Sequence, residues 1–221
     1  MCGRFTITKN KEVVIDFLKE NFNISNVEGM DVPRYNVGPG QDVISVIYDG
    51  ERYRAGLIAW DYKINIKGQY TQLINARSET VHEKYAFKKA FKNKRCLILS
   101  DGFYEWDQES KQPYRFILKT NEMFFYAGIY DQFLIDNQKS FGALILTTKA
   151  NQLVSNHHSR MPVILDVNQA KAFLREDIDL PSLQALLVPF SESKMHAYPV
   201  DTKVNKMSFD SPELIKKTTK D

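Results

Sequence analysis

A cysteine stands directly after the initiator methionine, in the run Met1-Cys2-Gly3-Arg4-Phe5. An initiator methionine is removed when the next side chain is small, so we expect a mature chain that begins at Cys2. Its α-amine, with an ordinary pKa of about 7.7–8.0, and its thiol, about 8.5, would then lie on adjacent carbons. A 1,2-aminothiol condenses with an aldehyde to a Schiff base, which the thiol closes to a thiazolidine ring. Alternatively, the thiolate serves as an N-terminal nucleophile, or Cys2 is an accident of a frayed terminus.

Four polar clusters interrupt otherwise apolar stretches, and each has a structural as well as a chemical interpretation. The first cluster, at residues 33–39, fits a rigid connector, and the second, at residues 75–79, fits the residues that begin a helix. The third, at residues 101–106, fits a strand that faces solvent, unless the Glu105 carboxyl is desolvated and its pKa raised. The fourth pairs two histidines with an arginine, but without an HExxH pattern it does not indicate a metal site. Together the clusters supply an acid, an imidazole, an amide and arginines, and the sequence does not show whether they converge. They are Pro33-Arg34-Tyr35-Asn36-Val37-Gly38-Pro39, Asn75-Ala76-Arg77-Ser78-Glu79, Asp101-Gly102-Phe103-Tyr104-Glu105-Trp106 and His157-His158-Ser159-Arg160-Met161-Pro162-Val163.

The bulk composition is that of an ordinary globular protein, with 221 residues, 43% hydrophobic and 26% charged. A net charge of +3 and a pI near 8.7 permit nucleic-acid binding without demanding it. Cys2 and Cys96 are too few for a disulfide scaffold or a cysteine-based zinc site, and Cys96 lies in a run typical of a buried strand. No apolar run reaches membrane-spanning length and no signal peptide is evident, so we expect a cytoplasmic protein.

Hydrophobic spacing predicts the elements that must position these groups. Residues 9–22 have helical spacing, residues 42–60 form a hairpin turning at Asp49-Gly50, and the capping-box pattern at Thr80 predicts a helix to residue 93. Further strands are expected over residues 95–100, 114–119, 123–130, 141–147 and 196–200, with 141–147 central, and further helices over 168–176 and 181–187. We therefore predict an α+β fold, a single domain over residues 1–221 built on a curved or barrel-like, mostly antiparallel sheet with peripheral helices and a loose C-terminal end.

Five motifs in this order, with Val204-Asn205 after them, carry a resemblance to a known family. They are Met-Cys-Gly-Arg-Phe, Pro-Arg-Tyr-Asn-Val-Gly-Pro, Asn-Ala-Arg-Ser-Glu, Gly-Phe-Tyr-Glu-Trp and His-His-Ser-Arg-Met-Pro-Val-Ile-Leu. The chain closely resembles the SRAP family, the SOS-response-associated peptidase-like proteins that sense abasic sites in single-stranded DNA. The match runs from residue 2 to about residue 205.

The resemblance implies a β-rich domain with a positively charged channel for single-stranded DNA, in which Cys2 forms a thiazolidine cross-link with the ring-opened aldehyde of an abasic site. It implies that Asn75 orients the Cys2 amine or the sugar, that Glu105 is the acid–base residue, and that His158, rather than His157, donates a proton to the opening deoxyribose. The residues it assigns to DNA binding are Arg4, Arg77 and Arg160 at phosphates, Trp106 and Pro39 at the bases, and Asn36 in the motif of Pro39. It implies no cofactor and no metal, and a monomer that acts beside replication-associated partners.

One departure from the family pattern concerns the DNA surface. Where the family carries Arg-Trp-Gly-Leu-Ile-Pro, this chain has Ala55 in place of the tryptophan and Ala59 in place of the proline. A lost aromatic platform could weaken DNA stacking by roughly 1–3 kcal/mol per base and leave the chemistry intact. Two other functions compete with covalent capture: an N-terminal cysteine peptidase, which includes autocatalytic removal of Met1, and a non-catalytic single-stranded DNA-binding module.

Overall fold

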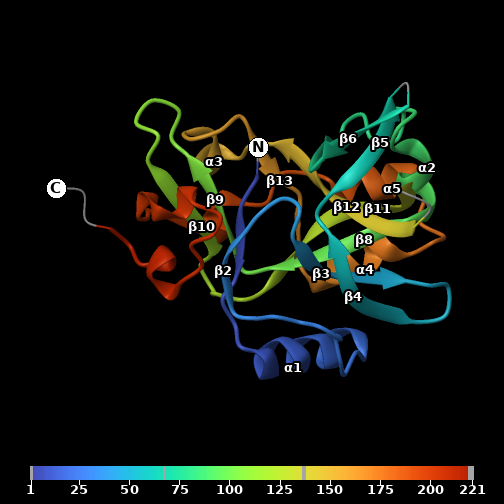
Figure 1. Ribbon diagram of the computed structural model, residues 1–221, viewed down its shortest axis with the longest axis horizontal. Helices are drawn as coiled ribbons and strands as arrows, with labels where there is room; N and C mark the ends of the chain where they lie inside the picture. The colour runs from blue at the N-terminus through green and yellow to red at the C-terminus, as the bar shows by residue number, and fades with distance from the viewer. Residues whose placement is uncertain (1, 67, 136–137, 219–221) are drawn as a thin grey trace.

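The protein is seen in a computed structural model that describes residues 2–66, 68–135 and 138–218. Two larger β-sheets lie side by side, with short helices around them, and β5 and β6 form a separate two-stranded sheet (Figure 1). The strands are β1 Phe5–Ile7, β2 Arg34–Val37, β3 Asp42–Tyr48, β4 Tyr53–Ala59, β5 Tyr62–Ile66, β6 Gln69–Leu73, β7 Asn75–Arg77, β8 Arg95–Ser100, β9 Gly102–Trp106, β10 Pro113–Leu118, β11 Phe124–Ile135, β12 Gln138–Lys149, β13 Arg160–Pro162, β14 Ile164–Leu165 and β15 Met195–Pro199. The helices are α1 Lys11–Phe22, α2 Lys88–Asn93, α3 Gln152–Ser155, α4 Val167–Leu174 and α5 Leu180–Leu186, and the 3-10 turns are η1 Glu192–Lys194, η2 Thr202–Asn205 and η3 Pro212–Ile215.

The larger sheet closes on itself through the ring β12–β4–β3–β8–β11–β12. All pairings in this ring are antiparallel except at the seam, where β12 runs parallel to β4 with Gly142 opposite Ala59. The seam requires a glycine, because a Cβ at Gly142 would collide with the carbonyl of Asp61. The apolar stretch at residues 143–147 of β12 is buried, so the expected central position of this strand is confirmed.

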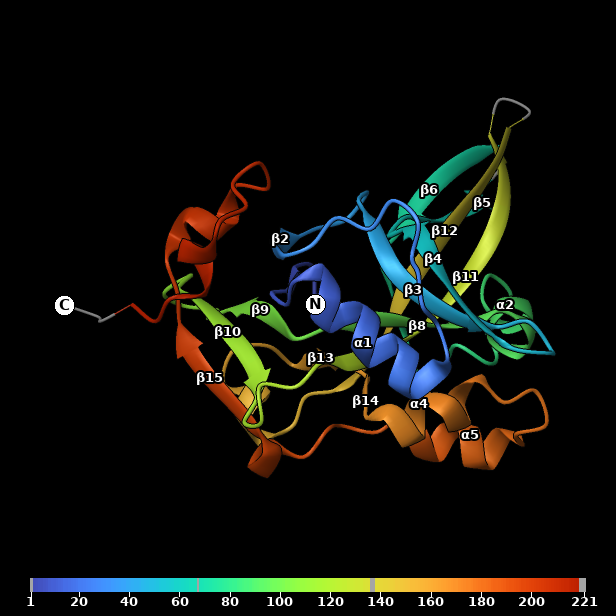
Figure 2. The same cartoon turned by 90° about the horizontal axis from the view of Figure 1, so that it is seen from below.

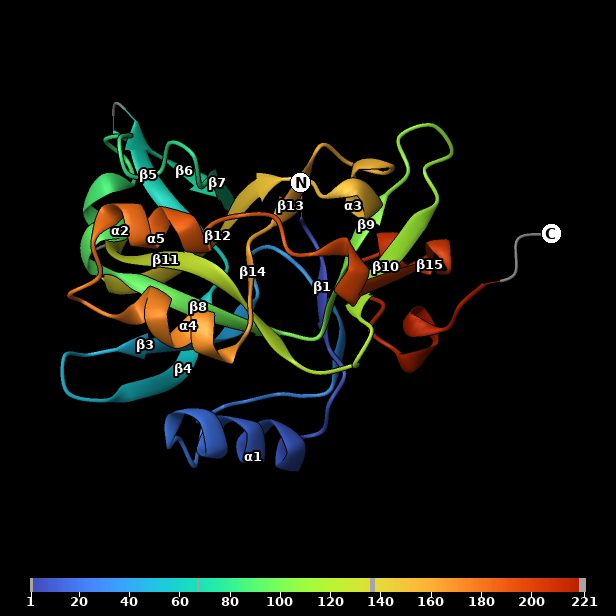
Figure 3. The same ribbon diagram turned by 180° about the vertical axis from the view of Figure 1, so that it is seen from behind.

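The smaller sheet has the order β15–β10–β9–β1–β2, and all of its pairings are antiparallel. Its strand β1 lies against the barrel, since the Phe5 ring contacts the rings of Trp60 and Tyr126 with centroids 5.3 and 5.6 Å apart. Figure 3 shows β1 between the two sheets, with α4 and α5 on the outer side of the barrel. A strand at this boundary can carry residues of one sheet into contact with residues of the other.

The predicted α+β fold with a barrel-like, mostly antiparallel sheet and peripheral helices is confirmed. The predicted strands at residues 95–100, 114–119, 123–130, 141–147 and 196–200 and the helices at 9–22, 168–176 and 181–187 are present with modest changes of bounds. The hairpin is also present, but its turn spans residues 49–52, because Asp49 caps the N–H groups of Glu51 and Arg52. None of the described helices is long and apolar enough to cross a membrane.

The helix predicted from Thr80 is wrong over its first half, because residues 79–87 form turns and α2 begins only at Lys88. The chain buries both Val81 and Phe87 here, and the N–H groups of Glu83 and Lys84 both donate to the Thr80 carbonyl, at 3.2 and 3.1 Å, in turns that do not continue as a helix. Tyr85, in the same turns, is 90% exposed.

Candidate active site at the start of the first strand

Cys2 lies just before β1. Its side chain is completely buried and belongs to the main hydrophobic core. Strand β1 pairs with β9 through Phe5 opposite Phe103, and the N–H of Tyr104 donates to the carbonyl of Arg4 at 3.0 Å. This register brings Cys2 to the end of β9 that carries Glu105. Burial, followed by the charge of Glu105, raises the pKa of the Cys2 thiol far above its usual range.

Glu105 is 3% exposed, so the solvent-facing interpretation of this strand position is wrong. Burial raises the pKa of its carboxyl from 4.5 to about 7. A carboxyl with this pKa exists as acid and as carboxylate in similar amounts near neutral pH, which suits proton transfer in both directions. The desolvation that the flanking aromatic residues suggested is thus present.

Asn75 reaches Cys2 from the other sheet. It lies in β7, which runs parallel to β12 with Asn75 opposite Ile145, and its Nδ2 donates to the Cys2 carbonyl at 2.9 Å. Its Oδ1 is buried and has no hydrogen-bond partner among the described residues. An amide that holds the backbone of Cys2 and keeps an unused acceptor beside it can receive a further N–H.

The two histidines occupy a turn between α3 and β13 and have different surroundings. The His157 ring packs on Tyr114, with centroids 4.2 Å apart, and touches the edge of Phe116. His158 accepts the backbone N–H of Arg160 at Nδ1, 3.0 Å away. Burial lowers the pKa of both imidazoles. His157 therefore has the contacts of a packing residue, and His158 is held by its backbone neighbour.

The three arginines expected to contact DNA differ in the ion pairs and hydrogen bonds that their guanidinium groups already make. Arg77, at the end of β7, is exposed and makes no ion pair or side-chain hydrogen bond within the described residues. Arg160 instead forms a two-pronged ion pair with Glu79, at 2.6 and 2.8 Å. Arg4 is half-buried, and its guanidinium donates to the Asn36 side chain at 2.8 Å and to carbonyls of the C-terminal segment.

A C-terminal segment, defined here as residues 201–216, covers β2 and β9 beside the site. Asn36 donates to carbonyls of this segment from Nδ2, the nearest being that of Phe209 at 2.8 Å. Trp106 is half-buried and donates from Nε1 to the Asn205 side chain at 2.7 Å. The Tyr104 ring forms a second hydrophobic cluster with Val200, Val204 and Leu214. Arg4, Asn36 and Trp106 thus hold this segment, and their contacts to DNA stay predictions.

Two other positions of interest lie apart from these contacts. Pro39 is half-buried in the loop between β2 and β3, where the N–H of Gly40 donates to the carbonyl of Trp60 at 3.0 Å. Ala55 lies opposite Val46 in the barrel hairpin and packs against the main core. Cys96 is buried in β8, as its apolar neighbours predicted. Among residues 2–66, 68–135 and 138–218, no three acidic, histidine or cysteine side chains are arranged to hold a metal ion.

Sequence reasoning missed the group that fixes β1. The buried carboxylate of Asp101 accepts hydrogen bonds from the Thr6 hydroxyl and from the N–H and hydroxyl of Thr8, each at 2.6 Å. The buried guanidinium of Arg115 completes the network, 3.3 Å from Asp101 and 2.9 Å from the Tyr198 hydroxyl. The only signal in the sequence was a charged residue within an apolar strand, at Arg115.

Comparison with known proteins agrees with this architecture. A solved structure from Bacteroides thetaiotaomicron superposes with a TM-score of 0.80, at 21% identity, over 99% of this chain and all of that one. A second, from Bordetella bronchiseptica, gives 0.75 at 20% identity over 90% of this chain. Fold and site thus define an α+β barrel protein with a buried cysteine near a buried carboxyl.

The sequence matches the family described as SOS response associated peptidase (SRAP) over residues 1–207, and the chain belongs to this family. It is 39% identical to the abasic site processing protein YoqW of Bacillus subtilis, over 97% of this chain and 99% of the relative. It is 28% identical to the abasic site processing protein YedK of Escherichia coli and 29% identical to HMCES of Gallus gallus, of which it covers 67%.

Proposed function

We propose that this protein captures abasic sites in single-stranded DNA covalently, through a thiazolidine formed by Cys2 as the mature N-terminal residue. The observation that carries the proposal is the placement of Cys2 between the Asn75 amide of one sheet and the buried Glu105 of the other. Relatives of this chain are named abasic site processing proteins, and an abasic site supplies an aldehyde, the group with which a 1,2-aminothiol reacts.

The chemistry begins at the amine. The neutral Cys2 amine adds to the C1′ aldehyde of the open sugar to give a carbinolamine. Oδ1 of Asn75, which has no hydrogen-bond partner among the described residues, is proposed to accept one amine hydrogen. Protonated Glu105 gives its proton to the carbinolamine hydroxyl, which leaves as water and produces the Schiff base. His158 is proposed to donate the proton that opens the closed deoxyribose.

Ring closure follows at the thiol. The Glu105 carboxylate, formed in the previous step, takes the Cys2 thiol proton, and sulfur adds to the imine carbon. The net reaction joins aldehyde, amine and thiol with loss of one water and no change of oxidation state. Because burial raises the thiol pKa, Cys2 has little thiolate of its own, which disfavours a peptidase mechanism that starts from a free thiolate.

The DNA path is proposed to run past Arg77, whose exposed guanidinium makes no ion pair or hydrogen bond within residues 2–66, 68–135 and 138–218. Arg160 would exchange its Glu79 contact for a phosphate, whereas Arg4 and Asn36 would act from positions held by the C-terminal segment. Trp106 and Pro39 are proposed to contact the bases next to the lesion. Binding of this kind tolerates any sequence, because it relies on backbone charge and ring stacking.

Intact-mass spectrometry with an oligonucleotide carrying one abasic site tests the proposal. We expect a chain without Met1 and then a heat-stable species at the mass of protein plus DNA minus one water. Cys2→Ser keeps the amine and loses the thiol, so it should give an adduct only after borohydride reduction. Cys96→Ser is the matched control and should react like the unaltered protein. A processed chain without adduct, or turnover of a peptide substrate without DNA, would favour the peptidase instead.

A further inference from the structure

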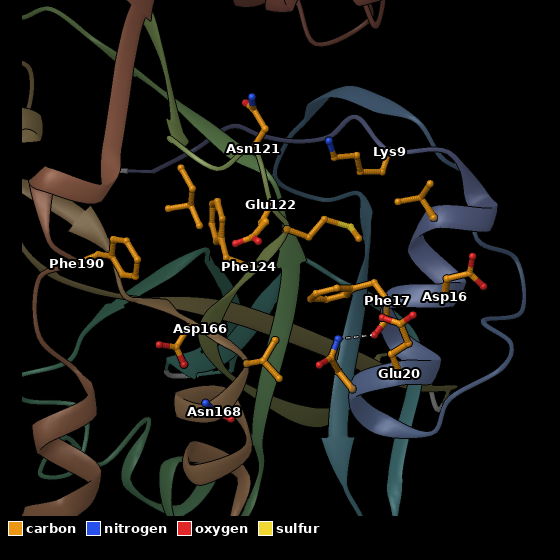
Figure 4. A pocket seen from close by; sticks show the side chains of 15 residues that line it. Lys9, Asp16, Phe17, Glu20, Asn121, Glu122, Phe124, Asp166, Asn168 and Phe190 are labelled. Atoms are coloured by element: carbon orange, nitrogen blue, oxygen red, sulfur yellow. Dashed lines mark hydrogen bonds between the residues drawn. The ribbon is translucent and has the colours of Figure 1, made fainter.

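A groove lies between α1, α4 and the start of β11, with a volume of about 670 Å³. Its floor is apolar: Figure 4 shows Phe17 and Phe124 between the two helices, and Val13, Met123, Val167 and Phe190 extend this surface. Val13 is 45% exposed, although a valine on a surface helix ordinarily faces the core. Met123 and Phe124 are buried, so the apolar surface that a partner could cover consists of Val13 and the half-exposed side chains of Phe17, Val167 and Phe190.

Four carboxylates stand at the rim of this floor, Asp16 and Glu20 on one side and Glu122 and Asp166 on the other (Figure 4). All four are exposed, and none forms an ion pair within the described part of the chain. Lys9 is the one basic residue of the lining. The groove is thus acidic on a chain whose net charge is +3, which makes it a poor surface for DNA and a complementary one for a cation.

The groove is also remote from the candidate active site. Figures 1 and 3 place α1 at the bottom of the molecule and β13, which carries Arg160, at the top, and Figure 2 shows the lower side with α1 and α4 next to each other. A partner in the groove would therefore leave the Cys2 side accessible.

We propose that this groove is a docking site for a protein partner that presents a basic amphipathic helix. An apolar face of such a helix, with anchors at i, i+3 or i+4 and i+7, matches an apolar floor between two helices. Lysines or arginines at the edges of that face meet the four rim carboxylates. The groove volume of about 670 Å³ is adequate for such anchors, because binding clefts of about 300–1,000 Å³ accommodate a few large side chains.

The test uses the full chain without DNA, so its outcome is independent of covalent capture. The probe is a fluorescein-labelled helical peptide of four turns, about 14 residues, made only of leucine and lysine. Fluorescence anisotropy should show binding that weakens with added salt, and amide NMR shifts should map to Val13, Phe17 and Met123. The same peptide with glutamate in place of lysine should not bind.

Charge reversal separates the groove from general attraction of a basic peptide. Asp16→Lys/Glu20→Lys should weaken binding of the lysine peptide about tenfold, equivalent to ~1.4 kcal/mol. Glu51→Lys/Glu109→Lys makes the same change at exposed sites elsewhere and should leave binding within about twofold. Equal loss in both variants, or equal binding of the glutamate peptide, overturns the proposal. Self-association of the chain that is lost in the first variant would assign the groove to a second copy and overturn it as well.

Discussion

Replacing Glu105 by Gln should make the protein more stable, and more so as the pH rises. Burial raises the pKa of this carboxyl from 4.5 to about 7, so between these values the folded chain binds more protons than the unfolded one. The free energy of unfolding must then fall as pH increases through this window. Each pKa unit is worth about 1.36 kcal/mol, which gives a loss of about 3 kcal/mol by pH 8.

Glutamine resembles the protonated carboxyl and cannot ionise, so Glu105→Gln escapes this loss. Urea unfolding at pH 4.5, 6, 7 and 8 should show a stability difference between variant and unaltered protein that grows by about 3 kcal/mol across the series. The contributions of groups that titrate in the same way in both proteins cancel in this stability difference. Glu109→Gln, at an exposed position three residues beyond Trp106, should show no such growth. A Glu105→Gln difference that stays constant with pH would refute the argument that burial keeps this acid neutral.

Three further changes test the rest of the structure. Arg77→Ala should weaken binding of single-stranded DNA and reduce the slope of log K against log salt by about 0.7, measured by anisotropy titrations at several salt concentrations; an unchanged slope contradicts a phosphate contact. Asp101→Ala should cost about 3–5 kcal/mol in urea unfolding, because it leaves the buried charge of Arg115 uncompensated, and a loss below 1 kcal/mol would contradict this. Gly142→Ala should cost about 1–3 kcal/mol at the barrel seam, where the added methyl meets the Asp61 carbonyl; an unaffected melting temperature would show that the seam relaxes.

Local patterns predicted most strands and helices because their burial follows the chain's own periodicity. The nearly all-apolar run at residues 141–147 predicts a buried strand, and all of it except Phe141 is buried in β12. The turns at residues 79–87 were missed because the capping-box pattern at Thr80 is a local signal, whereas Val81 and Phe87 of these turns pack into the main core. The short strands β1, β7 and β13 have three residues each, too few for a period to be visible.

For the candidate site, residue types indicated which groups could do chemistry, but not which of them meet. The contact between Asn75 and Cys2 joins residues 73 apart in sequence and depends on the parallel pairing of β7 with β12. The two histidines are adjacent in sequence, yet one packs on Tyr114 and the other receives a backbone N–H. Such differences arise from tertiary contacts, which no local pattern encodes.

The hydrogen bonds between Arg4 and the C-terminal segment have a consequence for how the chain folds during its synthesis. The carbonyls of Val204 and Asn205 receive the Arg4 guanidinium, so a residue two positions from Cys2 is fixed by chain made some 200 residues later. A nascent polypeptide leaves the ribosome with its N-terminus first and folds progressively. Its first residues thus stay without these hydrogen bonds until translation is almost complete, so the surroundings proposed to serve Cys2 are among the last parts of the fold to be assembled.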